Sequence, residues 1–203
     1  MNILPTLLVF APTRRAASET FIRANLSGLP FKTHAYFGDE RSLANPLRLL
    51  YGVSILVSKG LTIVGWLQFS SLPGSLVAWL LVKYHKPDLV LAEFGFHAVR
   101  VMHVASWCEV PLVVHFRGSD VSSESKFSKQ KIKYRILMRL ASAFIVKSIP
   151  MSNTLKDLGA PIEWILISPS GANSAFFYGS SPKTAPPILL LSLIHISEPT
   201  RPY

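Results

Sequence analysis

The clearest structural signal in this chain is "VPLVVHFRGSD", residues 110–120. A proline leads into a run of apolar residues at 112–116, and Gly118 follows at a point where a strand would turn. "KPDLVLAEF", residues 86–94, repeats this arrangement with an apolar run at 89–92. Runs that are apolar throughout, rather than at every second residue, are typical of strands covered on both faces. Two such strands in succession predict a buried parallel sheet.

Strand and helix patterns alternate outward from these two runs. Further strands are expected at residues 3–10, 33–36 and 142–148, and a last strand with its loop at 163–171. Helices are expected at residues 18–29, 46–84, 97–108, 126–141 and 149–161, the second of them interrupted at Gly52, Gly60 and "SLPGS". This alternation predicts an α/β fold with a doubly wound, mostly parallel sheet. Ligands bind such sheets at the carboxyl ends of the strands.

Composition fits a globular protein with an anionic partner. The chain has 203 residues, of which 49% are hydrophobic, and 21 basic against 11 acidic residues give a formal charge of +10. Phosphorylated sugars, an acidic membrane surface or nucleic acid would suit this charge. Cys108, the single cysteine, excludes an internal disulfide and suits a reducing cytoplasm. We interpret it as a packed residue rather than a nucleophile.

The longest apolar region, "YGVSILVSKGLTIVGWLQF", spans residues 51–69. Lys59 and three glycines interrupt it, so it falls short of the roughly 20 apolar residues that a membrane-spanning helix needs. We expect a core or interfacial helix here. The apolar N-terminus lacks the basic leader and cleavage site of a signal peptide, and we interpret it as the first strand.

Several familiar motifs are absent from the sequence. It contains no P-loop and no G-x-G-x-x-G after the first strand, which disfavours a Walker site or a dinucleotide cofactor. The histidines show no H-E-x-x-H spacing and there is no paired cysteine, so we expect no metal. No G-x-S-x-G elbow is present either.

The residues best placed for chemistry lie at the end of the "VPLVVHFRGSD" stretch. His115 and Arg117 share a strand face because side chains alternate with a period of two, and Gly118 and Asp120 follow. An imidazole or a guanidinium at that point can donate hydrogen bonds to a sugar hydroxyl or a departing phosphate. The alternative is a histidine bonded to the backbone and a solvated arginine.

Five segments in order resemble the N-terminal half of a family-four retaining glycosyltransferase of the GT-B fold. They are "SETFI", "KPDLVLAEFG", "VPLVVHFRGSD", "AFIVKSIPMSNTLKDLGAP" and "ISPSGANSAFF". The resemblance implies a Rossmann-like domain on the acceptor side of a cleft. It also implies transfer of a sugar from a nucleotide-sugar to a glycan or lipid-linked acceptor, in polysaccharide or glycolipid biosynthesis, without a bound cofactor.

The resemblance also implies roles for single residues. Relatives often carry a histidine before the glycine where this chain has Arg117, and His115 matches a second histidine, which leaves open which of the two approaches the donor. We take both as candidate catalytic residues. Candidate substrate-binding residues are Ser18, Glu19, Thr20, Glu93, Gly118, Asp120 and Ser148. Helix capping is the alternative for Ser18, Glu19 and Ser148, and Gly171 and Asn173 match a hinge between the two domains.

A basic helix at residues 126–139 supplies much of the positive charge. We expect Ile132, Ile136, Leu137 and Leu140 on one side and the cations elsewhere. The cations proposed to face a membrane are Lys126, Lys129, Lys131, Lys133, Arg135 and Arg139. An ordinary solvated helix and docking on anionic lipid are both open, whereas no DNA-reading motif favours nucleic acid. A non-catalytic membrane-binding module is therefore the alternative function.

The end of the chain resembles an interrupted second domain. We expect an acceptor-side domain at residues 1–178, a linker at 179–187 and the first strand of a donor domain at 188–190. "LSLIHISEPTRPY", residues 191–203, resembles a translated sequencing adaptor. No two glutamates have the seven-residue separation that relatives use to hold the donor. We therefore expect a fragment that is inactive alone. From the single cysteine and the resemblance, we expect a cytoplasmic protein, peripheral on the inner face of the cytoplasmic membrane.

Overall fold

A computed structural model describes residues 4–14, 22, 26, 28–121 and 124–169. The chain divides into two compact units, Met1–Pro169 and Ser170–Tyr203, and all described residues belong to the first. The linker at 179–187, the strand at 188–190 and the tail at 191–203 lie outside the described residues.

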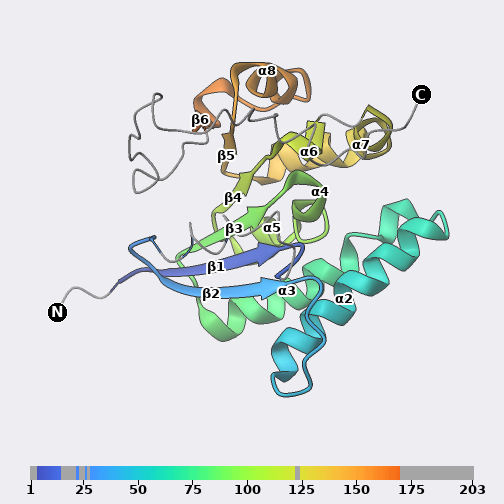
Figure 1. Ribbon diagram of the computed structural model, residues 1–203, viewed down its shortest axis with the longest axis vertical. Helices are drawn as coiled ribbons and strands as arrows, with labels where there is room; N and C mark the ends of the chain where they lie inside the picture. The colour runs from blue at the N-terminus through green and yellow to red at the C-terminus, as the bar shows by residue number, and fades with distance from the viewer. Residues whose placement is uncertain (1–3, 15–21, 23–25, 27, 122–123, 170–203) are drawn as a thin grey trace, which may run out of the picture. The chain divides into compact units, whose positions relative to one another are not determined.

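The described unit is built on a parallel β-sheet (Figure 1). Its strands are β1 (Thr6–Ala11), β2 (Lys32–Phe37), β3 (Leu89–Glu93), β4 (Leu112–His115), β5 (Ala143–Val146) and β6 (Ile165–Ile167). They are ordered β2-β1-β3-β4-β5-β6, and every pair is parallel. The expected Rossmann-like sheet is confirmed. The chain moves from β1 to one side and then to the other, so a switch point lies between β1 and β3.

Helices connect these strands. They are α2 (Pro46–Ile63), η2 (Leu67–Phe69), α3 (Leu72–His85), α4 (Gly95–Ala98), α5 (Val104–Cys108), α6 (Gly118–Val121), α7 (Glu124–Leu140), α8 (Ile149–Asp157) and η3 (Ile162–Trp164). Local sequence accounts for several ends. The Asn45 side chain accepts a hydrogen bond from the Arg48 N–H at 3.1 Å and so caps α2. Gly159, with φ of 102°, follows the end of α8.

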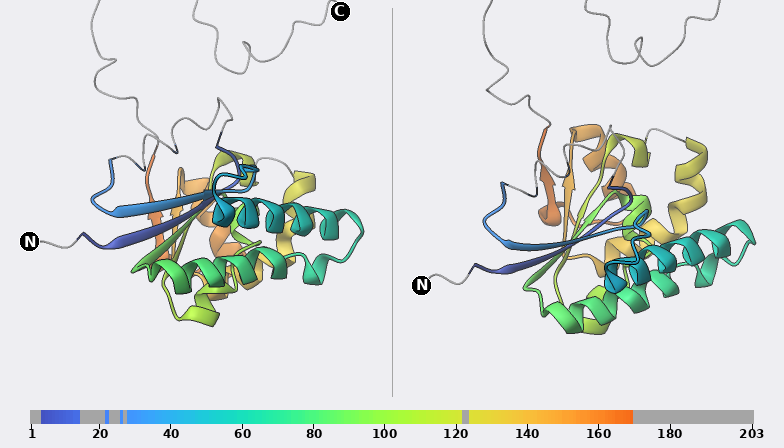
Figure 2. Two further views of the ribbon diagram at one scale, coloured as in Figure 1. Left: turned by 90° about the horizontal axis from the view of Figure 1, so that it is seen from below. Right: turned by 60° about the horizontal axis from the view of Figure 1, so that its bottom comes forward.

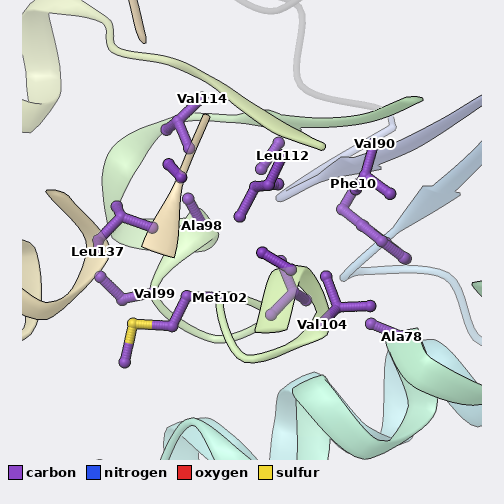
Figure 3. Packing of buried hydrophobic residues seen from close by; sticks show 14 of the residues in the cluster. Phe10, Ala78, Val90, Ala98, Val99, Met102, Val104, Leu112, Val114 and Leu137 are labelled. Atoms are coloured by element: carbon purple, nitrogen blue, oxygen red, sulfur yellow. The ribbon is translucent and has the colours of Figure 1, made fainter. Parts of the chain in front are cut away.

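The largest cluster of buried residues lies between one face of the sheet and the helices that cover it (Figure 3). Phe10, Val90 and Leu112 are fully buried there, and they belong to the same cluster as Ala78 of α3 and Leu137 of α7. Neighbouring positions on the strands, such as Leu7 and Val9, point to the opposite face and pack with Leu26. The strands are thus buried on both faces, which is the physical reason for their unbroken apolar runs.

Three details of the expected helices are wrong. Gly52 and Gly60 lie inside α2 without interrupting it, because a glycine weakens a helix by only about 1 kcal/mol and packing outweighs that cost. "SLPGS" begins α3, with Pro73 in its first turn, where its missing N–H costs nothing. The helix expected at 97–108 is split into α4 and α5 by turns at 99–103.

Helices α2 and α3 run side by side, and the turn that joins them lies beyond the end of the sheet (Figure 2). Within the described residues, α2 is the one helix long and apolar enough to cross a bilayer, and 28% of it is buried. One such helix is weak evidence for a span, since a helix that packs on a core meets the same criteria. Tyr51 and Ile55 of α2 are buried in the core, as expected of a core or interfacial helix.

Candidate functional site

Two neighbouring strands deliver the candidate residues to the carboxyl edge of the sheet. Glu93 ends β3 and His115 ends β4, and the register pairs these two residues directly. Because paired residues in a parallel sheet point to the same face, their side chains meet. Arg117 follows two residues later and joins them. All three side chains are buried, and Glu93 is only 1% exposed.

Glu93 is the centre of this cluster. Its Oε2 accepts hydrogen bonds from Arg117 Nη2 at 2.9 Å and Arg117 Nε at 3.2 Å. The same oxygen lies 3.3 Å from His115 Nδ1. Burial alone would raise the pKa of Glu93, but the hydrogen bonds and charges of His115 and Arg117 outweigh burial and lower it. The carboxylate is therefore ionised and holds both strand ends in place.

The contact with Glu93 orients the imidazole of His115. Since Nδ1 faces a carboxylate, that nitrogen carries a proton, and Nε2 is left for other partners. Nε2 is buried and has no hydrogen-bond partner in the part of the chain that the structure describes. A buried polar atom without a partner suits contact with a ligand. The imidazole can donate from Nε2 when protonated and accept there when neutral.

Asp120 ties together the loops that follow β3 and β4. Its Oδ1 accepts from the Phe96 N–H at 3.0 Å, and its Oδ2 accepts from the Arg117 N–H at 2.8 Å. Burial raises the pKa of Asp120 to about 6, against the effect of its backbone hydrogen bonds and of the Arg117 charge. This arrangement supports a positioning role for Asp120.

The backbone between β3 and α4 is constrained as well. Phe94 has φ of 67° and ψ of 132°, a conformation that costs a non-glycine residue on the order of 1–3 kcal/mol. A Cβ on the next residue, Gly95, would lie 2.3 Å from the ring of Phe116. Strained residues of this kind cluster at functional sites, which adds weight to this edge of the sheet.

The other candidate substrate-binding and hinge residues are not part of the Glu93, His115 and Arg117 cluster in the described part of the chain. Gly118 is exposed at the start of α6. Ser148 follows β5 and accepts from the Met151 N–H at 3.5 Å, the capping arrangement that was its alternative role. The remaining candidates, Ser18, Glu19, Thr20, Gly171 and Asn173, lie outside the described residues.

The expected orientation of α7 is wrong. Ile132 is 75% exposed and Ile136 is 40% exposed, while Tyr134, Leu137 and Met138 are buried. Tyr134 and Met138 form a second apolar stripe with Leu137 at helical spacing, and this face, which carries the large aromatic side chain of Tyr134, packs into the core. Lys131, Arg135 and Arg139 are exposed, Lys133 is partly buried, and the side chains of Lys126 and Lys129 are not among those described.

A cavity of about 730 Å³ opens beside this cluster. Its lining comes from the end of α2, from Phe96 of α4, from Asp120 of α6 and from helix α7. Two cations, Arg100 and Lys133, also line it. The sequence did not single out Arg100, because nothing in its neighbourhood marks it from other surface arginines. Among the described residues, no group of His, Cys, Asp or Glu is arranged to hold a metal ion.

Comparisons with known proteins bear on the fold. No protein-family model and no curated protein matches the sequence. Among solved structures, UDP-N-acetylglucosamine 2-epimerase from Rickettsia bellii aligns with a TM-score of 0.53 at 12% identity, over 82% of this chain and 45% of its own. S. aureus MnaA, solved with UDP, aligns with a TM-score of 0.51 at 11% identity, over 81% of this chain and 44% of its own.

This likeness confirms the Rossmann-like α/β fold. At such low identity it shows the fold alone. The chain spans less than half the length of either neighbour.

Proposed function

We propose that this chain forms the acceptor-side part of a nucleotide-sugar-dependent glycosyltransferase of the retaining, family-four type. The observation that carries the proposal is the buried cluster of Glu93, His115 and Arg117 at the carboxyl edge of a Rossmann-like sheet. The β1/β3 switch point adjoins this edge, where ligands of such sheets bind. The structural neighbours, an epimerase of a UDP-sugar and a protein solved with UDP, support a nucleotide-sugar as the donor.

The cluster suggests how the two candidate catalytic residues divide their work. Arg117 is bonded to Glu93, so we assign it a positioning role. His115 carries its proton on the side of Glu93, and its Nε2 would contact a hydroxyl of the donor sugar or the departing phosphate. In the transfer, the bond between the sugar C1 and the diphosphate oxygen breaks as the acceptor oxygen bonds to C1. The acceptor proton leaves with the diphosphate or to solvent.

Release of nucleoside diphosphate tests this proposal. A longer protein, in which a donor-binding domain follows this chain, is expected to release it from a UDP-sugar only when a glycan or lipid-linked acceptor is present. The 203-residue chain alone is expected to release none. His115→Asn in the longer protein should lower kcat by at least about 100-fold, which is typical of a lost acid–base or charge-stabilising group. Conversion of the UDP-sugar without any acceptor would identify an epimerase instead and overturn the proposal.

The second candidate is a module that binds an anionic membrane. The outward face of α7 favours it, because Ile132 and Ile136 are exposed among the cations Lys131, Arg135 and Arg139. The two functions are compatible, since an enzyme peripheral on the inner face of the cytoplasmic membrane could dock through this helix. A folded chain that sediments with anionic vesicles while its longer form transfers no sugar would favour the module alone.

A further inference from the structure

The turn between α2 and α3 carries an exposed apolar surface. Ile63 is 85% exposed, Val64 71% and Trp66 60%, and Leu67 and Phe69 beside them are about half exposed. Large apolar side chains gathered at one point of a surface mark an interaction site, and Trp is enriched where proteins meet the membrane interface. Figure 2 shows this turn beyond the end of the sheet.

Helix α7 lies against this turn. The Lys133 ammonium donates a hydrogen bond to Ser70 Oγ, directly after η2. Gln130 and Lys133 of α7 also line a cavity together with Ile63 and Leu67 of the turn. The helix that carries the exposed isoleucines and cations is therefore close to the apolar turn. An apolar tip beside a basic helix is the combination that interfacial proteins present to anionic lipid.

The cavity of about 730 Å³ lies between these two surfaces. Ile63, Leu67 and Phe96 give it apolar walls, and Arg100 and Lys133 supply its cations. Its size falls within the range of about 300–1,000 Å³ that small-molecule sites occupy. An amphiphile with a negative head would match this distribution of charge and apolar surface.

The two cations lack a counter-ion. Among the residues that the structure describes, no carboxylate lies within ion-pair distance of Arg100 or Lys133. Asp120 also lines the cavity, but backbone N–H groups occupy both its oxygens. Burial, and then the charge of Arg100, lowers the pKa of Lys133. An anion bound between them would relieve this repulsion.

The cavity also contains an unused hydrogen-bond acceptor. Gln130 lines it, and its Oε1 is buried without a partner in the described part of the chain. A hydroxyl on the bound head could donate to this oxygen. Phe96 of α4 and Asp120 of α6 lie in the helices that follow β3 and β4, so a head held here would lie beside the Glu93 and His115 cluster.

We propose that this cavity binds the phosphate-bearing head of an anionic lipid drawn from a bilayer. The phosphate would bind Arg100 and Lys133, and the acyl chains would leave over Ile63 and Leu67. This inference rests on the proposed function in one respect: the bound lipid would be the acceptor of the sugar or the carrier of that acceptor.

Binding of a short-chain, water-soluble phosphatidic acid to the 203-residue chain, followed by calorimetry, tests the proposal. Inorganic phosphate is the second probe, and it distinguishes a lipid head from a free anion. We expect the lipid to bind at least about tenfold more tightly than phosphate, because only the lipid also buries apolar surface. Equal affinity for the two probes would overturn the proposal.

Three variants localise the site. Arg100→Gln and Lys133→Gln should each weaken lipid binding about tenfold, the effect of losing one charge-assisted hydrogen bond. Lys156→Gln is the matched control, since it removes one exposed charge from α8, outside the cavity lining and outside the basic face of α7. An equal loss in all three variants would show diffuse charge attraction and contradict a site. Circular dichroism verifies that each variant is folded, and Lys133→Gln tests the site alone if Arg100→Gln does not fold.

The outcomes separate this inference from the proposed function. One outcome is that the chain binds the lipid and the Arg100 and Lys133 variants bind it more weakly, yet the longer protein transfers no sugar to any acceptor. The lipid-binding proposal is then supported and the transferase proposal fails. If the longer protein glycosylates a soluble glycan while the chain binds no lipid, the transferase proposal stands and the cavity proposal fails.

Discussion

Glu93 shows how a single buried carboxylate can hold a site together. Arg117 and His115 both contact one of its oxygens, and neither side chain is appreciably exposed. Removing one partner of a buried ion pair costs far more than the pair contributes, because the other charge is left unsolvated. The residue that stabilises the site is therefore an acid that the sequence placed among substrate-binding candidates.

Glu93→Gln should lower the free energy of unfolding by about 3–5 kcal/mol at pH 7, because it leaves Arg117 buried without a carboxylate. Since the pKa of Glu93 is lowered in the fold, its contribution is present above the ordinary value near 4.5 and is lost as pH falls through the folded value. Urea unfolding measures both effects.

The matched control is Arg14→Gln. Arg14 pairs with Glu40 at 2.7 Å but is 49% exposed, so this change should cost less than about 1 kcal/mol. Equal losses for the two variants would contradict the assignment of Glu93 as the centre of the cluster.

His97 makes the fold sensitive to acid. It is buried, and its Nε2 lies 2.7 Å from the Tyr51 hydroxyl. Burial, followed by the charges of Arg100 and Lys59, lowers the pKa of His97 to about 3. Below about pH 6.5, His97 binds a proton in the unfolded chain but not in the folded chain. The free energy of unfolding therefore falls as pH falls toward 3.

His97→Gln should remove this sensitivity. Between pH 7 and 5 we expect the wild type to lose about 2 kcal/mol relative to the variant, at about 1.4 kcal/mol per pH unit below 6.5. Urea unfolding at the two values measures the difference. Parallel pH profiles would show that His97 is protonated in the fold.

At the scale of elements, α2 shows two glycines with opposite roles. A Cβ at Gly52 would lie 2.0 Å from the Glu40 carbonyl oxygen, so the helix can approach the preceding loop only without a side chain there. A Cβ at Gly60 would meet nothing within 4 Å. One glycine permits packing and the other merely weakens the helix.

Gly52→Ala should therefore destabilise the protein by at least about 1–3 kcal/mol, the usual cost of overpacking. Gly60→Ala, in the same helix, should stabilise it by about 1 kcal/mol, the difference in helix propensity. Thermal unfolding of the pair gives the comparison. A similar shift in both would contradict the close contact at Gly52.

Helix α7 shows where sequence patterns are ambiguous. Positions 132, 136, 137 and 140 and positions 134, 137, 138 and 141 both form apolar stripes, and the core takes the second. Phe116 and Phe127 pack on Tyr134, which settles the choice. Helical spacing predicted the helix, but only its neighbours determined which side is buried.

For the whole molecule, net charge predicts salt-sensitive membrane binding. Screening shortens the reach of charge from about 10 Å at 0.1 M salt to about 3 Å at 1 M. The triple change of Lys131, Arg135 and Arg139 to Gln should thus weaken sedimentation with anionic vesicles. It should alter stability by less than about 1 kcal/mol, because all three are exposed. Vesicles of neutral lipid are the control. Binding to anionic vesicles that changes neither with salt nor with the three substitutions would contradict docking through α7.

The sequence by itself determined the class of fold and the convergence of His115 with Arg117. Unbroken apolar runs require strands buried on both faces, and a period of two brings alternate residues to one face. Both are local properties of the backbone, so they can be seen in the sequence without knowing what packs where.

Only the tertiary structure decided the pairing with Glu93, the buried side of α7 and the cavity between Arg100 and Lys133. Each depends on residues far apart in the chain, brought together by strand register or by helix packing. The register sets Glu93 opposite His115. Residues from α2, from the turn after α4 and from α7 line the cavity, Arg100 and Lys133 among them. Local patterns carry no information about such contacts, because their free energy arises when distant surfaces leave water together.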